Sequence, residues 1–238
     1  RKMPTVHVPV LLQEVIEGLQ LHVGDTVVDG TINAAGHAEA IAKVIGPSGV
    51  LVGIDADPGA ISRARERLGQ LPLDLRLYQG NFRKLHEYLA KAKIEKVDAF
   101  LFDLGLSSDQ LETSGRGFSF QNNEPLKMTF GEESPLTAAE ILNTWEEASI
   151  ADIIWGYGGE RYAKRIAKVI CEMREAAPLT RTQDLVTAVS KAIPARSRHG
   201  KIHFATKSFQ ALRIAVNDEL GALREVLPQA WEALSVGG

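Results

Sequence analysis

Aspartates follow short apolar runs in the first half of the chain. The run Thr26–Asp29 ends in one, and Val50–Ile54 and Val97–Phe102 are followed directly by Asp55 and Asp103. Ligands of open parallel sheets bind beyond the carboxyl ends of the strands, so we expect the loops after these runs to line one crevice. Asp55 is placed to hydrogen-bond a ribose diol. Asp103 would face a positively charged ligand group or accept a hydrogen bond from an attacking amine. The alternative interpretation is that Asp103 is a solvated acidic residue of a loop without a functional role.

The loop from Asp29 to His37 reads Asp-Gly-Thr-Ile-Asn-Ala-Ala-Gly-His. Its small residues let the backbone come close to a ligand, and the N-terminus of the following helix favours a negative group such as a ligand carboxylate. A tight strand-to-helix turn without a ligand is the alternative. The loop lacks the GxGxxG pattern, which weakens a prediction of pyrophosphate binding. Asp57 precedes Pro58 and is predicted to cap a helix.

Asn81 and Phe82 follow another strand-like run, Leu73–Tyr78. Phe82 is placed to pack against an adenine ring, and Asn81 to hydrogen-bond the edge of that ring. The alternative for Phe82 is ordinary core packing in the helix predicted from Phe82 to Ala92, which is the commoner fate of a phenylalanine.

The scaffold that must position these residues alternates strands with helices. Strand-like runs at 26–29, 50–54, 73–78 and 97–102 are separated by stretches in which apolar residues recur at helical spacing. This alternation predicts βαβ units, a parallel sheet and an α/β fold.

The second half of the chain predicts helices only. No strand-like run occurs for about the next hundred residues after Asp103. Thr137 to Glu140 and Ser149 to Asp152 have the spacing of capping boxes. A long helix is predicted from Phe209 onward, with a kink at Pro228. We therefore predict one discontinuous domain, residues 1–105 plus 209–238, with a helical domain inserted at 106–208.

Composition excludes several classes of protein. The chain has 238 residues, 45% apolar and 24% charged, which predicts a folded core rather than a disordered chain. No apolar run is long enough for a membrane span, and Arg1 to Val8 lacks the apolar region of a signal peptide, so we expect a cytoplasmic protein without a membrane partner. Cys171 is the only cysteine. With no second cysteine, and no further ligands beside His199 and His203, we expect no disulfide or metal site.

The distribution of charge is uneven although the net charge is only -3. No carboxylate lies between Asp184 and Asp218. The basic residues of that interval are Lys191, Arg196, Arg198, Lys201, Lys207 and Arg213. Such an interval suits phosphate binding, although a solvated loop beside a helix is an equal alternative.

Further stretches, spread over nearly the whole chain, are specific enough to indicate a family. They are His7-Val-Pro-Val-Leu-Leu, Asp29-Gly-Thr, Gly36-His37, Gly53-Ile-Asp55, Asp103-Leu-Gly-Leu-Ser-Ser108, Gln110-Leu111, Arg116-Gly-Phe-Ser-Phe120, Tyr157-Gly158, Glu160-Arg161, Ala205-Thr206, Phe209-Gln-Ala-Leu-Arg-Ile214 and Asn217-Asp-Glu-Leu220. In these stretches and their order the chain resembles the ribosomal RNA small-subunit methyltransferase H family, which is MraW-like and methylates the N4 amino group of cytosine.

The resemblance implies a class I, Rossmann-like methyltransferase that uses S-adenosyl-L-methionine and acts on a cytidine of small-subunit (16S-type) ribosomal RNA. It implies that Ala35, Gly36 and His37 contact the methionine part of the cofactor. Asp55 would contact the ribose and Phe82 the adenine, and Asp103 and Gln110 would complete the pocket. The inserted helical domain would recognise RNA, with Arg196, Arg198, Lys201 and Lys207 holding phosphates. Free RNA and the assembled small subunit both remain open as substrate. The oligomeric state also remains open, with a homodimer as one option.

Two departures from the family's pattern bear on activity. The family's first loop is richer in glycine, whereas this chain has Asn33-Ala34-Ala35, and an alanine forced to positive φ would lower cofactor affinity. The family also continues past Gly237-Gly238 into a further strand, and Arg1-Lys2 precede Met3. We therefore expect a fragment whose C-terminal strands are missing, with an exposed sheet edge.

The expected mechanism orients a weakly nucleophilic amine toward the methyl donor. Asp103, or a backbone carbonyl of the following loop, would accept a hydrogen bond from that amine. Phe118 and Phe120 are candidates for stacking on an unstacked base, or else they anchor the helical domain. Rival hypotheses are a non-catalytic RNA-binding protein of ribosome assembly, a nicotinamide oxidoreductase, which the first loop disfavours, and amino methylation of DNA or protein.

Overall fold

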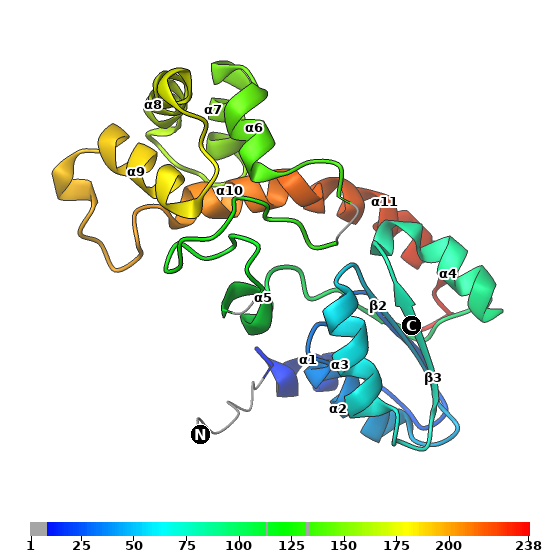
Figure 1. Ribbon diagram of the computed structural model, residues 1–238. Helices are drawn as coiled ribbons and strands as arrows, with labels where there is room; N and C mark the ends of the chain where they lie inside the picture. Colours follow the sequence, from blue (N-terminus) through cyan, green and yellow to red (C-terminus); the bar gives the residue numbers. More distant parts are fainter. Residues whose placement is uncertain (1–8, 113, 132–133) are drawn as a thin grey trace, which may run out of the picture. The chain divides into compact units, whose positions relative to one another are not determined.

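The computed structural model describes residues 9–112, 114–131 and 134–238; Arg1, Lys2, His7 and the other residues before Pro9 lie outside the described residues. The chain divides into two compact units, one formed by Arg1–Ser107 with Leu220–Gly238 and the other by Ser108–Glu219 (Figure 1). We call them the sheet unit and the helical unit and describe each by itself.

The sheet unit contains four parallel strands. They are β1 (Thr26–Asp29), β2 (Val50–Asp55), β3 (Asp74–Gln79) and β4 (Ala99–Leu101), in the order β3-β2-β1-β4. All four predicted strands are present, and the α/β fold class is confirmed. The fourth is shorter than predicted, because Val97 forms only an isolated parallel bridge with Leu234. The order of strands reverses between β1 and β4, which makes their carboxyl ends the switch point where such sheets bind ligands.

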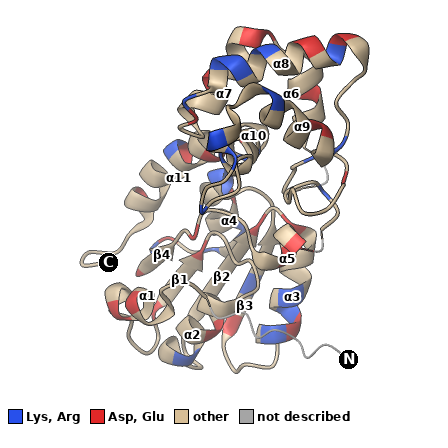
Figure 2. Cartoon of the chain, turned by 90° about the vertical axis from the view of Figure 1, so that its left-hand side faces the viewer, with Lys and Arg blue, Asp and Glu red and all other residues tan. Residues whose placement is uncertain are grey.

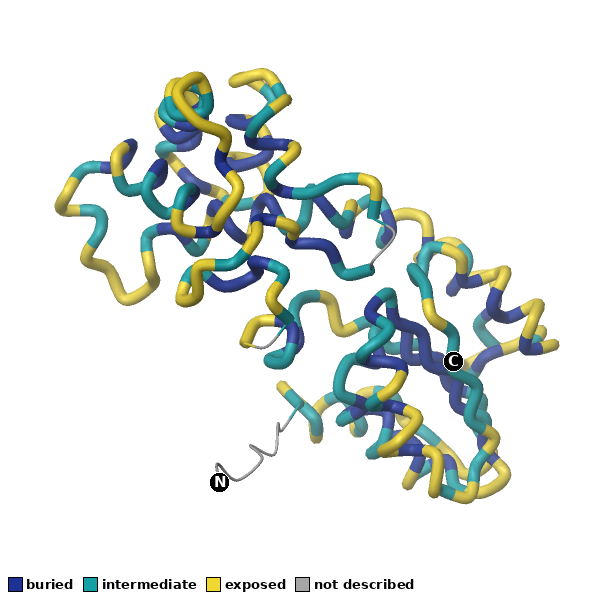
Figure 3. The backbone as a smooth tube through the Cα atoms, viewed as in Figure 1, coloured by how far each residue is buried: buried dark blue, intermediate teal, exposed yellow. Residues whose placement is uncertain are grey.

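Helices cover both faces of the sheet. On one face lie α1 (Leu12–Leu19), α2 (Gly36–Ile45) and α3 (Pro58–Leu68). On the other lie α4 (Leu85–Ala92), which follows the 3-10 turn η1 (Phe82–Lys84), and α11 (Glu219–Ala233). Successive residues of β1 point to opposite faces of the sheet, as expected for a strand. Val27 packs in the core beneath α1, α2 and α3, and Val28 packs in the core beneath α4 and α11. Figure 3 shows the inner strands buried between helices whose outer faces are exposed.

The helical unit has no strand among its described residues. Its helices are α5 (Ser108–Glu112), α6 (Ala138–Thr144), α7 (Glu147–Gly156), α8 (Ala163–Ala176), α9 (Thr182–Ala192), the 3-10 turn η2 (Ala195–Ser197) and α10 (Thr206–Asn217). Helix α7 packs between α8 and α10, and α8 also packs against α9. The prediction of an all-helical second half therefore holds for the described residues.

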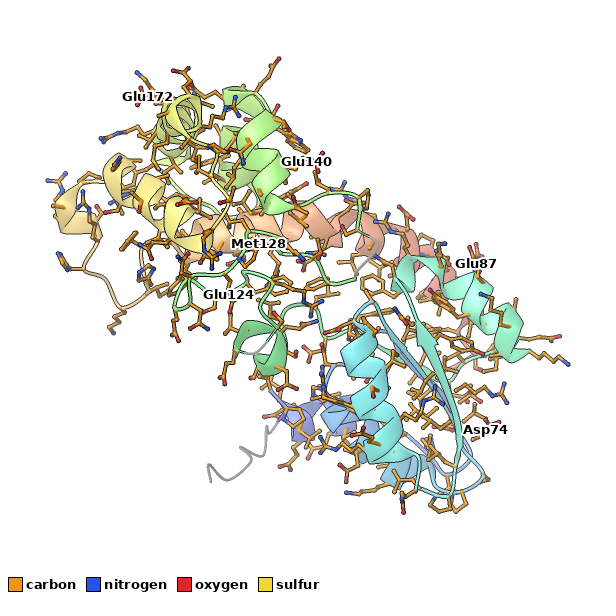
Figure 4. All side chains as sticks on the ribbon, viewed as in Figure 1. Asp74, Glu87, Glu124, Met128, Glu140 and Glu172 are labelled. Atoms are coloured by element: carbon orange, nitrogen blue, oxygen red, sulfur yellow. The ribbon has the colours of Figure 1, made fainter. Side chains whose placement is uncertain are left out.

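Side-chain hydrogen bonds hold the long segment between α5 and α6 against this helical core. Glu124 accepts a hydrogen bond from the amide of Gly117, and the Glu124 amide donates to Thr182 Oγ1. Asn217 of α10 donates to the carbonyl of Met128 at 2.7 Å and accepts from the amide of Phe130 at 2.8 Å. Met128 is fully buried, and both Met128 and Glu124 are labelled in Figure 4. Polar contacts thus replace regular secondary structure along this segment.

Three predictions about helices were wrong in detail. Ser149 does not cap a helix, because α7 already begins at Glu147; Thr137 does cap α6 and accepts a hydrogen bond from the Glu140 amide. The predicted long helix is two helices, separated at Asp218, whose φ is +46°. The compact helical unit extends to Glu219 rather than to residue 208, because α10 packs against α7 and α6.

The described ranges lack two features. None of the helices they contain is both long enough and apolar enough to cross a membrane. No group of three or more His, Cys, Asp or Glu side chains in those ranges is arranged to hold a metal ion.

Candidate active site

Asp29 and Asp103 stand at the switch point of the sheet, one ending β1 and the other following β4. Thr31 links them. Its amide donates to Asp29 Oδ1 at 3.0 Å, and its hydroxyl oxygen accepts from the Asp103 amide at 2.6 Å. The Asp103 side chain is about half exposed, at 49%, whereas Asp29 is 1% exposed. The switch point therefore has one buried carboxylate and one that is open to solvent or to a ligand.

Burial and neighbouring charge disfavour ionisation of Asp29. Burial raises the pKa of Asp29 to about 7; the hydrogen bond from Thr31 opposes that shift, and the carboxylates of Asp55 and Asp103 add to it. A positively charged group bound here would stabilise the ionised form of Asp29. The site is thus matched electrostatically to a cation.

Asp55, at the end of β2, holds the first loop in place. Its Oδ2 accepts from the amide of Asn33 at 2.9 Å, and its Oδ1 accepts from the amide of Asp57 at 2.8 Å. Burial raises the pKa of Asp55 to about 6 against these two hydrogen bonds. Each carboxylate oxygen has two lone pairs, so both can still accept a further hydrogen bond, as from a ribose diol. Asp57 caps α3 as predicted, accepting from the Gly59 amide.

His37, in the first turn of α2, faces Asp103. Its Nε2 lies 3.1 Å from the carbonyl oxygen of Val10, and its Nδ1 lies 3.7 Å from Asp103 Oδ2. A carbonyl can only accept, so Nε2 carries the proton. The other ring nitrogen then turns toward the carboxylate of Asp103.

The backbone of the first loop is tightly confined. A Cβ on Gly36 would lie 2.3 Å from Cγ of Pro9, so only glycine leaves room for the Pro9 ring at this point. Ala35 precedes Gly36 with φ of +58° and is completely buried. The departure from the family's glycine-rich loop therefore falls on a residue that adopts a left-handed conformation, which costs alanine roughly 1 kcal/mol.

Phe82 and Asn81 lie where the third strand leads into α4. The Phe82 ring packs against Phe102, with 5.6 Å between ring centroids, and belongs to the apolar cluster under α4 and α11. Asn81 caps η1 by accepting from the Arg83 amide. These contacts account for both residues without a ligand, and an adenine contact of Phe82 stays a prediction.

Gln110 and the predicted RNA-binding residues belong to the helical unit. Gln110 is buried in α5, where its carbonyl accepts from Ser114 Oγ. Arg196, Lys201 and Lys207 are exposed, whereas Arg198 is half buried and donates to the carbonyl of Ile193 at 3.3 Å. Figure 2 shows basic residues on α8 and near α10 as well.

Of the two candidates for base stacking, Phe118 is unsuited. It is 4% exposed and stacks on Phe130. Phe120 stacks on His203 with ring centroids 4.1 Å apart, and His203 stacks in turn on Phe204. These rings tie the basic interval to the segment before α6.

Sequence reasoning missed the roles of Asp29, Thr31 and Val10. Asp29 was recognised only as the end of a strand and Thr31 only as part of a loop, and the burial that raises the pKa of Asp29 becomes evident only in the fold. Val10 acts through its backbone carbonyl, which leaves no mark in a residue type. Its position in the quoted stretch His7-Val-Pro-Val-Leu-Leu was the one available signal.

The chain is similar to proteins that have already been assigned to a family. A model of the MraW methylase family matches residues 4–238. Ribosomal RNA small subunit methyltransferase H of Geotalea uraniireducens (strain Rf4) is 44% identical over 232 residues, covering 98% of this chain and 74% of that protein. The protein of the same name from Geobacter sulfurreducens is 45% identical, covering 98% of this chain and 75% of its own length.

Solved structures show a more distant likeness. Fibrillarin from Aeropyrum pernix, in complex with S-adenosyl-L-methionine, matches 36% of this chain and 37% of its own, with 20% identity and a TM-score of 0.31.

Proposed function

The chain belongs to the MraW methylase family and is an S-adenosylmethionine-dependent methyltransferase, and from this we propose that it methylates the N4 amino group of a cytidine in small-subunit ribosomal RNA. The observation that carries the proposal is Asp103, a half-exposed carboxylate that lies two residues after β4 and faces His37 at the switch point. A carboxylate in this position suits an amine that must be oriented and must lose a proton.

The described residues fit the cofactor. Bound S-adenosylmethionine supplies an electrophilic methyl group on a positively charged sulfur. Asp29, Asp55 and Asp103 lie at or just after the carboxyl ends of the strands, where their carboxylates would attract that positive charge, and binding it would favour the ionised form of Asp29. Asp55 retains lone pairs for the ribose hydroxyls, and the N-terminus of α2 favours the carboxylate of the methionine part. Phe82 would complete the part of the pocket that the sheet unit supplies.

Asp103 has a direct role in the proposed mechanism. The lone pair of the cytosine amino nitrogen is delocalised into the ring, so the amine is a poor nucleophile. A hydrogen bond from the amine to Asp103 would localise that lone pair, orient it and direct the leaving proton. The Thr31 hydroxyl fixes the backbone of Asp103 through a hydrogen bond of 2.6 Å, which keeps this acceptor in place.

The RNA would be held by the helical unit. We propose that the exposed residues Arg196, Lys201 and Lys207 bind phosphates and that Arg198 supports their loop while contributing its remaining donors. The absence of any carboxylate between Asp184 and Asp218 favours this role.

A product analysis tests the proposed function. The chain is incubated with isotopically labelled S-adenosylmethionine and either free small-subunit ribosomal RNA or assembled subunits, and the RNA is digested to nucleosides for mass spectrometry. We expect labelled N4-methylcytidine, strongly reduced by Asp103→Asn and unchanged by Asp74→Asn, an exposed aspartate at the amino end of β3. Label on another nucleoside, or full turnover by Asp103→Asn, would refute the assignment.

A further inference from the structure

Two large aromatic side chains are exposed where α7 ends. Trp155 is 61% exposed and Tyr157 is 38% exposed. Exposure of such rings forgoes a large apolar contribution to folding, because an aromatic side chain can bury ~150–250 Å². The pair belongs to the segment Trp155–Tyr162, which connects α7 to α8 and which the catalytic site of the sheet unit does not use.

Lys207 is fixed beside these aromatic residues. Its Nζ donates to the carbonyl of Gly159 at 3.0 Å, and the amide of Gly159 donates to the carbonyl of Trp155 at 2.8 Å. The neighbouring Gly158 has no room for a side chain, since a Cβ there would lie 2.5 Å from the carbonyl oxygen of Lys207. The segment Trp155–Tyr162 therefore sits directly on the first turn of α10, with a lysine held at its surface.

Two arginines lie at the other end of the segment. The guanidinium of Arg161 stacks over the Tyr162 ring, 4.6 Å from its centroid, and donates to Ser197 Oγ at 3.3 Å. The Tyr162 hydroxyl shares a hydrogen bond with the same Ser197 oxygen at 3.3 Å. Arg196 directly precedes Ser197 in η2, so it also lies close by. The hydrogen bond with Ser197 lowers the pKa of Tyr162, and the positive charges of Arg161 and Arg196 lower it further.

The charge of this surface is strongly one-sided. Residues 155–162 and 196–207 contain five basic residues and one acidic residue, Glu160. Glu160 is buried and accepts from the amide of Tyr162 at 2.9 Å, so its carboxylate is turned into the fold. Arg161, Arg196 and Lys207 are exposed. The nearest exposed carboxylate of α7, Asp152, lies one helical turn before Trp155.

We propose that Trp155, Tyr157, Arg161, Arg196 and Lys207 form a binding surface for single-stranded RNA. The two exposed rings stack on unpaired bases, and the three cations bind the phosphates between them. Single strands are favoured over duplexes because only unpaired bases offer their faces to a stacking ring. This inference rests on the proposed RNA substrate and identifies the form in which the RNA is held.

Fluorescence anisotropy tests the surface. The probe is a fluorescein-labelled RNA of about 12 nucleotides with mixed sequence, within the ~4–16 nucleotides of known single-strand sites. We expect Trp155→Ala to weaken binding roughly 5- to 100-fold, and Trp155→Phe much less. The matched control is Trp231→Ala in α11, because Trp231 is 79% exposed but lies outside this surface. It should leave the affinity unchanged.

Salt dependence separates the cations from the rings. Single substitutions of Arg161, Arg196 or Lys207 by alanine should each lower the slope of log affinity against log salt by about 0.7, whereas Trp155→Ala should leave the slope unchanged. Far-UV circular dichroism and thermal unfolding verify that each variant is folded.

The inference is overturned if the wild-type chain does not bind the probe, binds the annealed duplex more tightly, or binds equally well after Trp155→Ala. The proposed binding surface is refuted, and the proposed function survives, if ribosomal RNA is methylated at cytidine N4 but the variants have an unchanged KM for that RNA. The proposed function fails alone if the surface binds single strands as described and no N4-methylcytidine is formed.

Discussion

The Nδ1 atom of His37 lies 3.7 Å from Asp103 Oδ2, while the opposite ring nitrogen is hydrogen-bonded to the carbonyl of Val10. Since Nε2 carries the proton, a neutral His37 ring presents a lone pair to a carboxylate. Two acceptors that face each other need a donor between them. The protonated amino group of the methionine part of the cofactor is such a donor.

We expect His37→Phe to weaken S-adenosylmethionine and S-adenosylhomocysteine alike, by about 10- to 100-fold, because a hydrogen bond to a charged group contributes roughly 1.5–3 kcal/mol. Isothermal titration calorimetry measures both ligands. His86→Phe is the matched control, since His86 is exposed on α4 and pairs with Glu232. A His37 variant with unchanged affinity for both ligands would show that the ring does not contact the amino group.

Cofactor affinity should depend on pH through Asp29. Its pKa of about 7 means that the carboxyl group is largely protonated below neutrality, whereas a cationic ligand favours the ionised form. Affinity for S-adenosylmethionine should therefore rise as the pH rises through 7, by up to about tenfold per pH unit below that value, and level off above it. Calorimetry between about pH 5.5 and about pH 8.5 covers the range in which Asp29 changes its protonation. Repeating it in buffers of different ionisation enthalpy should detect proton release on binding. Asp29→Asn should flatten the profile, and an unaltered profile would exclude Asp29 as its source.

Ala35→Gly should stabilise the chain. Ala35 holds φ of +58°, a conformation that costs alanine about 1 kcal/mol and glycine almost nothing. We expect a gain of roughly 0.5–1 kcal/mol in the free energy of unfolding and a modest rise in cofactor affinity. Ala38→Gly is the matched control, because Ala38 is also fully buried but helical, and its substitution should destabilise by a similar amount. Urea denaturation compares the two, and equal losses would show that φ at Ala35 carries no strain.

Gly36→Ala should displace the N-terminal segment from His37. The new Cβ would lie 2.3 Å from Cγ of Pro9 but 3.5 Å from its Cβ. The single variant should lose the hydrogen bond between Val10 and His37, and the double variant with Pro9→Ala should regain it. The ¹⁵N chemical shifts of the His37 ring report the site of protonation directly, and cofactor affinity should follow them. If the double variant behaves like Gly36→Ala alone, the contact with Pro9 is not the cause.

The strands of the sheet unit could be predicted to within two residues at every end. β1, β2 and β4 lie in mainly apolar runs followed by a loop, whereas β3 alternates apolar and polar residues. The positions of the polar residues after those strands could also be predicted, and Asp55, Asp103 and His37 lie near the carboxyl ends of the strands. Asp57 and Thr137 were predicted as caps because capping depends on residue type and on the few positions that follow.

Other features depend on contacts that sequence spacing does not encode. Ser149 has the spacing of a cap, but α7 begins two residues earlier. Asp218 interrupts the last helical pattern through a single left-handed residue, although apolar residues continue at helical spacing on both sides. Sequence spacing does not place Lys207 near Trp155, whereas the hydrogen bonds from Lys207 to Gly159 and from Gly159 to Trp155 do.

The carboxylates at the switch point also bear on what happens after methyl transfer. Asp29, Asp55 and Asp103 would face one positive charge fewer after methyl transfer, because the sulfur of the product is neutral. Their negative field would then hold the product less firmly than the reactant, and Asp29 could take up a proton again. The site is therefore expected to favour turnover by its electrostatics alone, because the reaction itself removes the charge by which its ligand is retained.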